Sequence, residues 1–118
     1  MATILIAEDE LNIAAFVNKG LQRAGYHTQI ATDGQTALAM ALSEPFDLVL
    51  LDLGLPVIDG WSVLAKIRTQ SNQPPIIIVT ALDGIEERHQ SLSLGAADYI
   101  TKPFRFSQLL ASVRRHLP

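Results

Sequence analysis

Short apolar runs and helical stripes of apolar residues alternate along the whole chain. Apolar runs predict strands at residues 3–7, 46–51, 76–79 and 97–100, and an alternation of apolar and polar residues predicts one more at 26–30. Apolar residues three or four positions apart predict helices over residues 13–24, 37–42, 63–67, 85–94 and 106–117. The sequence therefore predicts five strand–helix units in succession.

This alternation of elements predicts the fold. Strands separated by helices form a parallel sheet with right-handed crossovers, and a continuous apolar strand needs cover on both of its faces. Only the strand at 26–30 alternates, which places it at an edge of the sheet and favours the strand order 2-1-3-4-5. We therefore expect an α/β protein: a three-layer α/β/α sandwich with a flavodoxin-like, five-stranded parallel sheet, forming one domain over residues 1–118.

The composition narrows the class of protein. Of the 118 residues 48% are hydrophobic and 18% are charged, against about a quarter charged in an average domain, so much of the backbone should be buried. The absence of cysteine excludes disulfides and thiolate metal sites. A net charge of −3 is a poor match to nucleic acid, and no apolar run is long enough for a signal peptide or a membrane span. We expect no direct nucleic-acid or membrane partner, and the lack of cysteine allows a reducing compartment, in keeping with the cytoplasmic location that we expect.

Acidic residues follow two strands that should be neighbours in this sheet. Glu8, Asp9 and Glu10 come directly after the first strand, and Asp52 comes directly after the third. In an open parallel sheet, ligands bind beyond the carboxyl ends of the strands, where the strand order reverses. Glu8, Asp9 and Asp52 should therefore share one cleft, and the simplest partner for three carboxylates is a divalent cation with hard oxygen ligands, Mg²⁺ or Mn²⁺.

Two further side chains at strand ends suit a phosphoryl group. Thr80 follows the fourth strand and offers a hydroxyl donor, and Lys102 follows the fifth and offers an ammonium. A metal and a lysine neutralise phosphoryl oxygens, while a carboxylate acts as nucleophile in an in-line displacement. The set predicts phosphoryl chemistry at an acidic site.

The same residues give the chain a family resemblance over its whole length. The matching segments are Glu8-Asp9, residues 52–60 (DLGLPVIDG), Thr80-Ala81 and residues 95–104 (GAADYITKPF). Together they resemble the receiver domain of two-component response regulators. The resemblance implies a receiver fold, in a domain that stands alone or belongs to a longer response regulator.

The resemblance also implies roles for individual residues. Asp52 would accept a phosphoryl group from a sensor histidine kinase or a histidine phosphotransfer protein, with Thr80 and Lys102 contacting that group. Mg²⁺ would be held by Asp9, Asp52 and the carbonyl of Gly54, with Glu8 contributing through water. The domain would be no enzyme for other substrates, because it catalyses only its own phosphorylation and dephosphorylation.

A switch and a special peptide bond belong to the same resemblance. On phosphorylation Thr80 would move toward the phosphoryl group and Tyr99 would turn inward. The surface made by the predicted helix at 85–94, the strand at 97–100 and the last helix would then signal to an output domain or another protein. The bond between Lys102 and Pro103 would be cis, an isomer found in only about 5–6% of bonds that precede proline.

Other polar and aromatic residues have structural explanations. Glu10 fits the start of the first helix, where acids stabilise the helix dipole, and Asp59 fits a helix cap. Phe104 and Phe106 should pack the last helix. The three histidines show no ligand spacing and should lie on the surface; they are His27, His89 and His116.

One alternative function remains open on the sequence. The chain could be an interaction module that keeps the receiver fold and signals without phosphate. Motifs for dinucleotide and nucleotide phosphates are missing, FMN would need a phosphate loop where the acids stand, and the DxD pattern of aspartyl phosphatases does not occur after the first strand. The presence of Asp52, Thr80 and Lys102 together favours the phosphorylated receiver.

Overall fold

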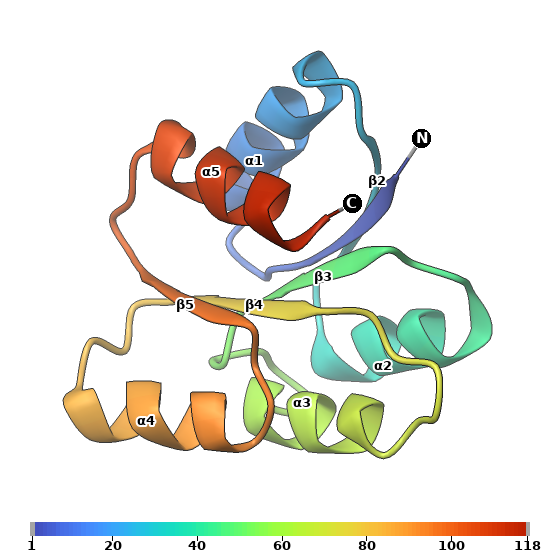
Figure 1. Ribbon diagram of the computed structural model, residues 1–118, viewed down its shortest axis with the longest axis vertical. Helices are drawn as coiled ribbons and strands as arrows, with labels where there is room; N and C mark the ends of the chain where they lie inside the picture. The colour runs from blue at the N-terminus through green and yellow to red at the C-terminus, as the bar shows by residue number, and fades with distance from the viewer. Residues whose placement is uncertain (1, 118) are drawn as a thin grey trace.

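The computed structural model describes residues 2–117, in which five strands and five helices alternate (Figure 1). The strands are β1 (Thr3–Ala7), β2 (His27–Ala31), β3 (Leu48–Leu51), β4 (Ile76–Thr80) and β5 (Asp98–Thr101). The helices are α1 (Leu11–Arg23), α2 (Gly34–Ser43), α3 (Gly60–Arg68), α4 (Ile85–Ser93) and α5 (Phe106–His116). Every predicted element is present, including the helix with the sparsest apolar pattern, α4.

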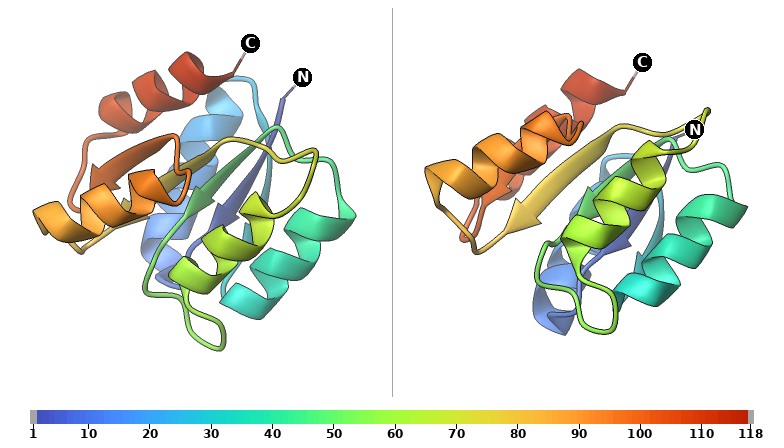
Figure 2. Two further views of the ribbon diagram at one scale, coloured as in Figure 1. Left: turned by 60° about the horizontal axis from the view of Figure 1, so that its bottom comes forward. Right: turned by 90° about the horizontal axis from the view of Figure 1, so that it is seen from below.

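The strands form one parallel sheet in the order β2-β1-β3-β4-β5, as predicted, with β2 at an edge. Helices α1 and α5 cover one face, and α2, α3 and α4 cover the other (Figure 1). The two further views show the same three layers, with the strand arrows running in one direction (Figure 2). Among the described residues no helix is both long and apolar enough to cross a membrane.

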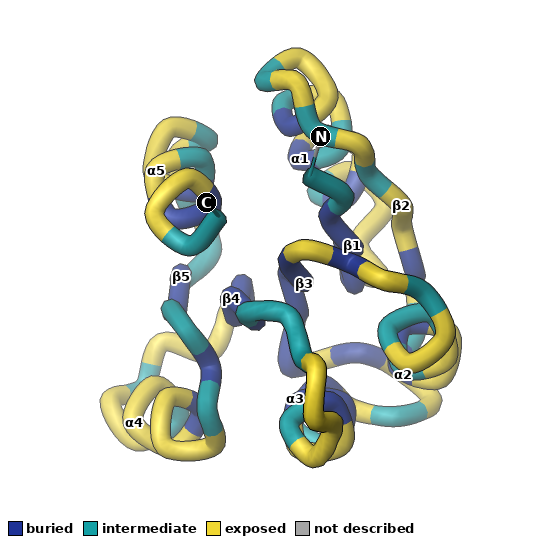
Figure 3. The backbone as a smooth tube through the Cα atoms, turned by 45° about the vertical axis from the view of Figure 1, so that its right-hand side comes forward, coloured by how far each residue is buried: buried dark blue, intermediate teal, exposed yellow. Residues whose placement is uncertain are grey.

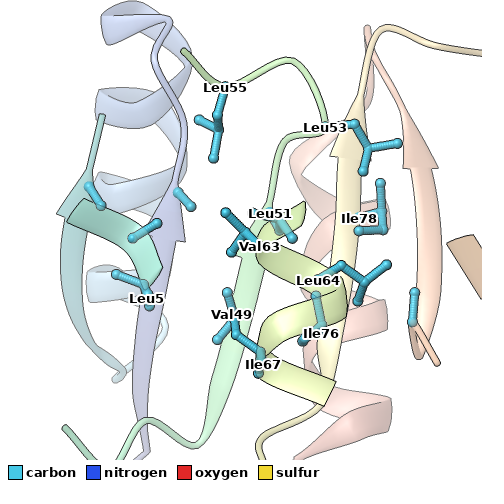
Figure 4. Close-up of a cluster of buried hydrophobic side chains, with 14 of the residues drawn as sticks. Leu5, Val49, Leu51, Leu53, Leu55, Val63, Leu64, Ile67, Ile76 and Ile78 are labelled. Carbon is cyan, nitrogen blue, oxygen red and sulfur yellow. The ribbon is translucent and has the colours of Figure 1, made fainter. Parts of the chain in front are cut away.

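Each face of the sheet has its own apolar core, because successive side chains of a strand point to opposite faces. Under α3, Val63, Leu64 and Ile67 pack against strand side chains (Figure 4); the strand residues in this core include Leu5, Val49, Leu51, Ile76 and Ile78. The opposite core joins the sheet to Val17 and Leu21 of α1 and to Leu109 and Val113 of α5. The three central strands are buried along nearly their whole length, and the outward faces of the helices are exposed (Figure 3).

The bounds of several strands differ from the predicted ones. Strand β3 begins at Leu48 and not at residue 46, although Phe46 is buried in the core. The Asp47 carboxylate accepts a hydrogen bond from the backbone N–H of Thr3 at 2.7 Å, outside the β3 ladder. Strands β2 and β5 are each shifted by one residue toward the C-terminus. Apolar side chains mark burial, whereas a strand end depends on backbone pairing that they do not determine.

The structural roles expected for Asp59 and Phe106 are confirmed. The Asp59 carboxylate accepts a hydrogen bond from the backbone N–H of Ser62 at 3.0 Å and caps α3. Phe106 packs edge-on against Phe16, with the ring centres 6.0 Å apart, and so joins α5 to α1. Both contacts fix helices that lie beside the acidic end of the sheet.

The loop between β3 and α3 contains a strained turn at Val57. Val57 has φ of 72°, a left-handed conformation that disfavours β-branched side chains. The N–H of Ile58 donates to the carbonyl of Pro56 at 2.9 Å, which makes Val57 the central residue of a γ-turn of the rare, strained kind. The Val57 side chain is 75% exposed and so gains little from packing.

We predict that Val57→Gly stabilises the protein by about 0.5–1 kcal/mol, because glycine removes the left-handed strain and its greater freedom in the unfolded chain offsets only part of the gain. Urea unfolding measures the effect. Val57→Ala is the matched control: it keeps a Cβ atom, so it should give a smaller change. A glycine variant less stable than the native chain would contradict the strain argument.

Candidate functional site

The register of the sheet brings Glu8 and Asp52 together. Ala7, the last residue of β1, is the register partner of Leu51, the last residue of β3, so the next residue of each strand leaves the sheet at the same height. The backbone N–H of Asp52 donates to the carbonyl of Ala7 at 3.0 Å and continues the ladder. Both carboxylates are buried, with exposed fractions of 4% for Glu8 and 6% for Asp52.

The start of α3 holds the backbone of Asp52 in place. A Cβ atom on Gly60 would lie 2.2 Å from the carbonyl oxygen of Asp52, so only glycine allows this close approach. The N–H of Gly60 also donates to the carbonyl of Leu53 at 2.9 Å. Asp52 is therefore held between the sheet on one side and the first turn of α3 on the other.

The predicted acidic cluster is present. Carboxylate oxygens of Glu8, Asp9 and Asp52 lie within 4.8 Å of one another, with Asp9 exposed at the mouth of the site. Gly54 lies beside them: its N–H donates to Asp52 Oδ1 at 3.2 Å, and the place of a Cβ atom is open apart from that oxygen at 3.9 Å. An all-oxygen donor set with room beside it fits a hard divalent cation.

Burial changes the acid strength of Glu8. Removal of Glu8 from water raises the pKa of its carboxyl to about 7, and the nearby charge of Asp52 acts in the same direction. Hydrogen bonds from Lys102 and from the N–H of Glu10 oppose the rise. Because the buried acids repel one another, the site favours the binding of positive charge.

Lys102 supplies one such charge. Its Nζ lies 2.6 Å from Glu8 Oε1, 3.2 Å from Asp52 Oδ2 and 3.5 Å from Glu10 Oε1, and its side chain is only 8% exposed. Burial would lower the pKa of the Lys102 ammonium, but the hydrogen bond to Glu8 and the charge of Asp52 outweigh that effect, so the pKa is raised. The peptide bond between Lys102 and Pro103 is cis, the isomer that the resemblance implies.

Thr80 and Tyr99 both form hydrogen bonds with the backbone of Leu82, one with its N–H and the other with its carbonyl. Thr80 is buried at the end of β4, and its hydroxyl accepts a hydrogen bond from the N–H of Leu82 at 3.3 Å. The hydroxyl of Tyr99 donates to the carbonyl of Leu82. Tyr99 is 3% exposed and thus points inward, and this burial is the main cause of the raised pKa of its phenol.

Two features of the site go beyond the residues singled out in the sequence. Glu10 lies at the N-cap position of α1, where an acid was expected, but its side chain makes no capping hydrogen bond and its carboxylate contacts Lys102 instead. The run of three acids at positions 8–10 was the signal for this contact. Leu82 contacts Thr80 and Tyr99 through its backbone N–H and carbonyl. Every residue has such groups, so the identity of the side chain could not have predicted these contacts.

The fold and the site define a doubly wound α/β domain with an acidic, lysine-paired site at the point where the strand order reverses. A family model described as the response regulator receiver domain matches residues 4–114. The chain belongs to this family, and the resemblance seen in the sequence is confirmed.

Known proteins agree with this assignment. The transcriptional regulatory protein HprR of Escherichia coli is 43% identical over 114 residues, which are 97% of this chain and 51% of that protein. The receiver domain of the Francisella response regulator 1452 superposes with a TM-score of 0.93 at 34% identity, covering 98% of this chain and 95% of that one.

A third match has a metal in its structure. The receiver domain of the sensor histidine kinase PA1611 of Pseudomonas aeruginosa, with a magnesium ion coordinated in its active site cleft, gives a TM-score of 0.89 at 33% identity. The match covers 98% of this chain and 96% of that one. This chain spans about half the length of the curated relatives it matches.

We predict that at about pH 8, where Glu8 is ionised, Lys102→Met destabilises the metal-free protein by about 3 kcal/mol, because it leaves the buried carboxylates of Glu8 and Asp52 without their cation. Asp52→Asn is the matched variant: it removes one carboxylate and leaves Lys102 paired with Glu8, so its stability should stay within about 1 kcal/mol of native or rise. Urea unfolding in EDTA measures both variants. Equal losses of stability in the two variants would contradict the argument that Lys102 neutralises the buried carboxylates.

We predict that metal-free native protein loses stability as pH rises and that Glu8→Gln removes much of this loss. The pKa of Glu8 is raised from 4.5 to about 7, so the stability contributed by its protonated form is complete below 4.5 and is lost as pH rises through 7. Between about pH 5.5 and about pH 8 the difference is on the order of 1–2 kcal/mol. Urea unfolding of the native protein and of Glu8→Gln, in EDTA at both pH values, measures this difference. If the stability of the two proteins changed with pH in the same way, the prediction would be wrong.

Proposed function

We propose that Asp52 is the phosphoacceptor of a signalling switch, phosphorylated in a metal-dependent reaction. The observation that carries the proposal is the position of the Asp52 carboxylate at the carboxyl edge of the sheet: it is buried, it belongs to the acidic cluster with Glu8 and Asp9, and it contacts the Lys102 ammonium. A nucleophilic carboxylate beside a lysine and a threonine hydroxyl suits phosphoryl transfer. Membership of the receiver family supports the same role.

The donor set supports Mg²⁺ as the cofactor, with Mn²⁺ as an alternative. Asp9, Asp52 and the carbonyl of Gly54 would hold the cation directly, and Glu8 would contribute through water. When bound, the cation supplies positive charge that offsets the repulsion between the carboxylates and the phosphoryl oxygens. The magnesium in the PA1611 receiver domain supports this assignment.

In the proposed transfer, a carboxylate oxygen of Asp52 attacks the phosphorus of a phosphohistidine. A P–O bond forms to Asp52, the P–N bond breaks, and its electron pair returns to the imidazole nitrogen. The Lys102 ammonium, already 3.2 Å from Asp52 Oδ2, pairs with a phosphoryl oxygen, and the Thr80 hydroxyl donates to another. The domain catalyses only this reaction and the later hydrolysis.

The partners follow from the chemistry and from the relatives. The donor is a sensor histidine kinase or a histidine phosphotransfer protein, and the reaction takes place in the cytoplasm. Several relatives are named as transcriptional regulatory proteins and are about twice as long as this chain. We infer that the surface of α4, β5 and α5, with Thr80 and Tyr99 beneath it, controls an output domain or a separate protein, while this domain itself does not contact nucleic acid.

We predict that the native chain gains one phosphoryl group when incubated with acetyl phosphate and Mg²⁺, and that Asp52→Asn gains none. Intact-mass spectrometry at neutral pH measures the modification. Omitting the metal by adding EDTA should abolish it. Asp59→Asn is the matched control, because Asp59 lies on the same loop but caps α3 outside the acidic cluster, and it should react like the native chain.

The outcomes separate the two functions that the sequence left open. A phosphorylated native chain and an unreactive Asp52→Asn chain support the phosphoacceptor. A native chain that stays unmodified with Mg²⁺ present favours an interaction module that signals without phosphate. Equal modification of the native and Asp52→Asn chains would show that the phosphoryl group is accepted by another residue.

A further inference from the structure

The sequence contains three Asp–Gly pairs: Asp33-Gly34, Asp59-Gly60 and Asp83-Gly84. In such a pair the backbone nitrogen of the glycine can attack the side-chain carboxyl carbon of the aspartate. Glycine favours this attack because it has no Cβ atom and its backbone is free to turn. The reaction requires a carboxyl group and a nitrogen that can meet, so the folded structure determines which of the three pairs reacts.

The carboxylates of two pairs are held in place by helix capping. Asp33 is the N-cap of α2, and its carboxylate accepts a hydrogen bond from the N–H of Thr36 at 2.7 Å. Asp59 is the N-cap of α3, and its carboxylate accepts a hydrogen bond from the N–H of Ser62 at 3.0 Å. Each cap has to open before its carboxyl carbon can turn toward the next peptide nitrogen.

The nitrogens of the same two pairs are held as well. The N–H of Gly34 donates to the carbonyl of Pro56, and the N–H of Gly60 donates to the carbonyl of Leu53, both at 2.9 Å. Both glycines are also packed so closely against backbone atoms of distant residues that neither has room for a Cβ atom. In these two pairs, therefore, both reacting groups are fixed.

The third pair lacks these restraints. Asp83 and Gly84 lie in the loop between β4 and α4 (Figure 1), outside any helix or strand, and Asp83 is exposed. Among the described residues, none donates a hydrogen bond to the Asp83 carboxylate and none accepts one from the N–H of Gly84. The helix that follows has only Ser91 buried among its described residues, so the loop is free to open locally.

We propose that Asp83 is a site of spontaneous isoaspartate formation in the folded protein, whereas Asp33 and Asp59 are protected. The Gly84 nitrogen forms a bond to the Asp83 carboxyl carbon and loses its proton, the bond from that carbon to its hydroxyl oxygen breaks, and one water leaves. A succinimide ring remains. Water then adds to one of the two ring carbonyls: opening at the side-chain carbonyl restores aspartate, and opening at the main-chain carbonyl gives isoaspartate.

The modification changes the entry into α4. Isoaspartate carries the chain through its side chain, so the backbone gains one carbon atom just before the helix. The next residue, Gly84, supplies the carbonyl that accepts the first hydrogen bond of α4, from the N–H of Arg88 at 3.1 Å. The connection between β4 and α4 is thereby lengthened. This inference does not depend on the proposed role of Asp52.

The experiment compares the three pairs within one chain. Native protein is kept at mildly acidic pH, either folded or unfolded in urea, and is then cut into peptides. Isoaspartate in each peptide is measured by methyl transfer from labelled S-adenosylmethionine with an isoaspartyl methyltransferase. In the folded chain Asp83 should form about tenfold more isoaspartate than Asp33 or Asp59, because a cap and an amide hydrogen bond must open first in each of the other pairs. In urea the three pairs should form similar amounts.

Two kinds of variant test the route of the reaction. Gly84→Ala should lower isoaspartate at Asp83 severalfold; φ of −69° suits alanine, and the added methyl group meets only the flexible end of the Glu87 side chain. Asp83→Asn and Asp59→Asn form a matched pair, since an asparagine amide closes to the same ring with loss of ammonia and asparagine still caps a helix. In the folded state Asp83→Asn should deamidate about tenfold faster than Asp59→Asn, as followed by intact-mass spectrometry.

The outcomes decide the proposal. Isoaspartate that is concentrated at Asp83 in the folded chain and evenly spread in urea supports it. Equal amounts at the three pairs in the folded chain, or none at Asp83, would overturn it. An unchanged amount in Gly84→Ala, or equal deamidation of the two asparagine variants, would also overturn it, because the reaction would then not depend on the freedom of this loop.

Discussion

The rest of the structure has to keep three buried charged groups paired at the carboxyl edge of the sheet. These groups are two carboxylates and one ammonium. Glu8 and Asp52 are both almost fully shielded from solvent, and Lys102 lies within hydrogen-bond distance of each. Charges in such surroundings are stable only when their partners are fixed in position, because the cost of desolvation is repaid only by good geometry. The site remains acidic even so, with Asp9 at its mouth, and it therefore favours added positive charge.

The apolar layers provide that fixed geometry. Strands β1 and β3 are locked in register by ladder hydrogen bonds and by side chains that are buried on both faces, so Glu8 and Asp52 leave the sheet side by side. Packed interiors resist displacement, since an opened gap loses dispersion contacts. Gly60 then brings the first turn of α3 against the backbone of Asp52. A hydrophobic core far larger than the site thus holds three charged groups in place.

The fold and the acidic cluster were predictable from the sequence because both follow from local patterns. Runs such as Leu48–Leu51 require cover on both faces, and the strand order then brings Glu8, Asp9 and Asp52 to one edge. The left-handed backbone at Val57 and the two hydrogen bonds of Leu82 were not predictable. Valine normally disfavours φ of 72°, and peptide groups are the same in every residue, so both features depend on how the loops close over the finished core.

Helix α4 is held to the sheet by few buried side chains, since Ser91 is the one buried residue among those described in it. A ligand shifts an equilibrium only by the difference in its contacts between two states. The contacts that link the site to α4 are a Thr80–Leu82 hydrogen bond, a Tyr99–Leu82 hydrogen bond and the Arg88 contact with the Tyr99 ring, and such contacts contribute about 0.5–1.5 kcal/mol each. Because these contributions are similar in size, the loss of any one of the three contacts changes the balance among them. The loss of one such contact against the central strands would be negligible, so we expect a response to the proposed phosphorylation of Asp52 on the side of the sheet where the packing is lightest.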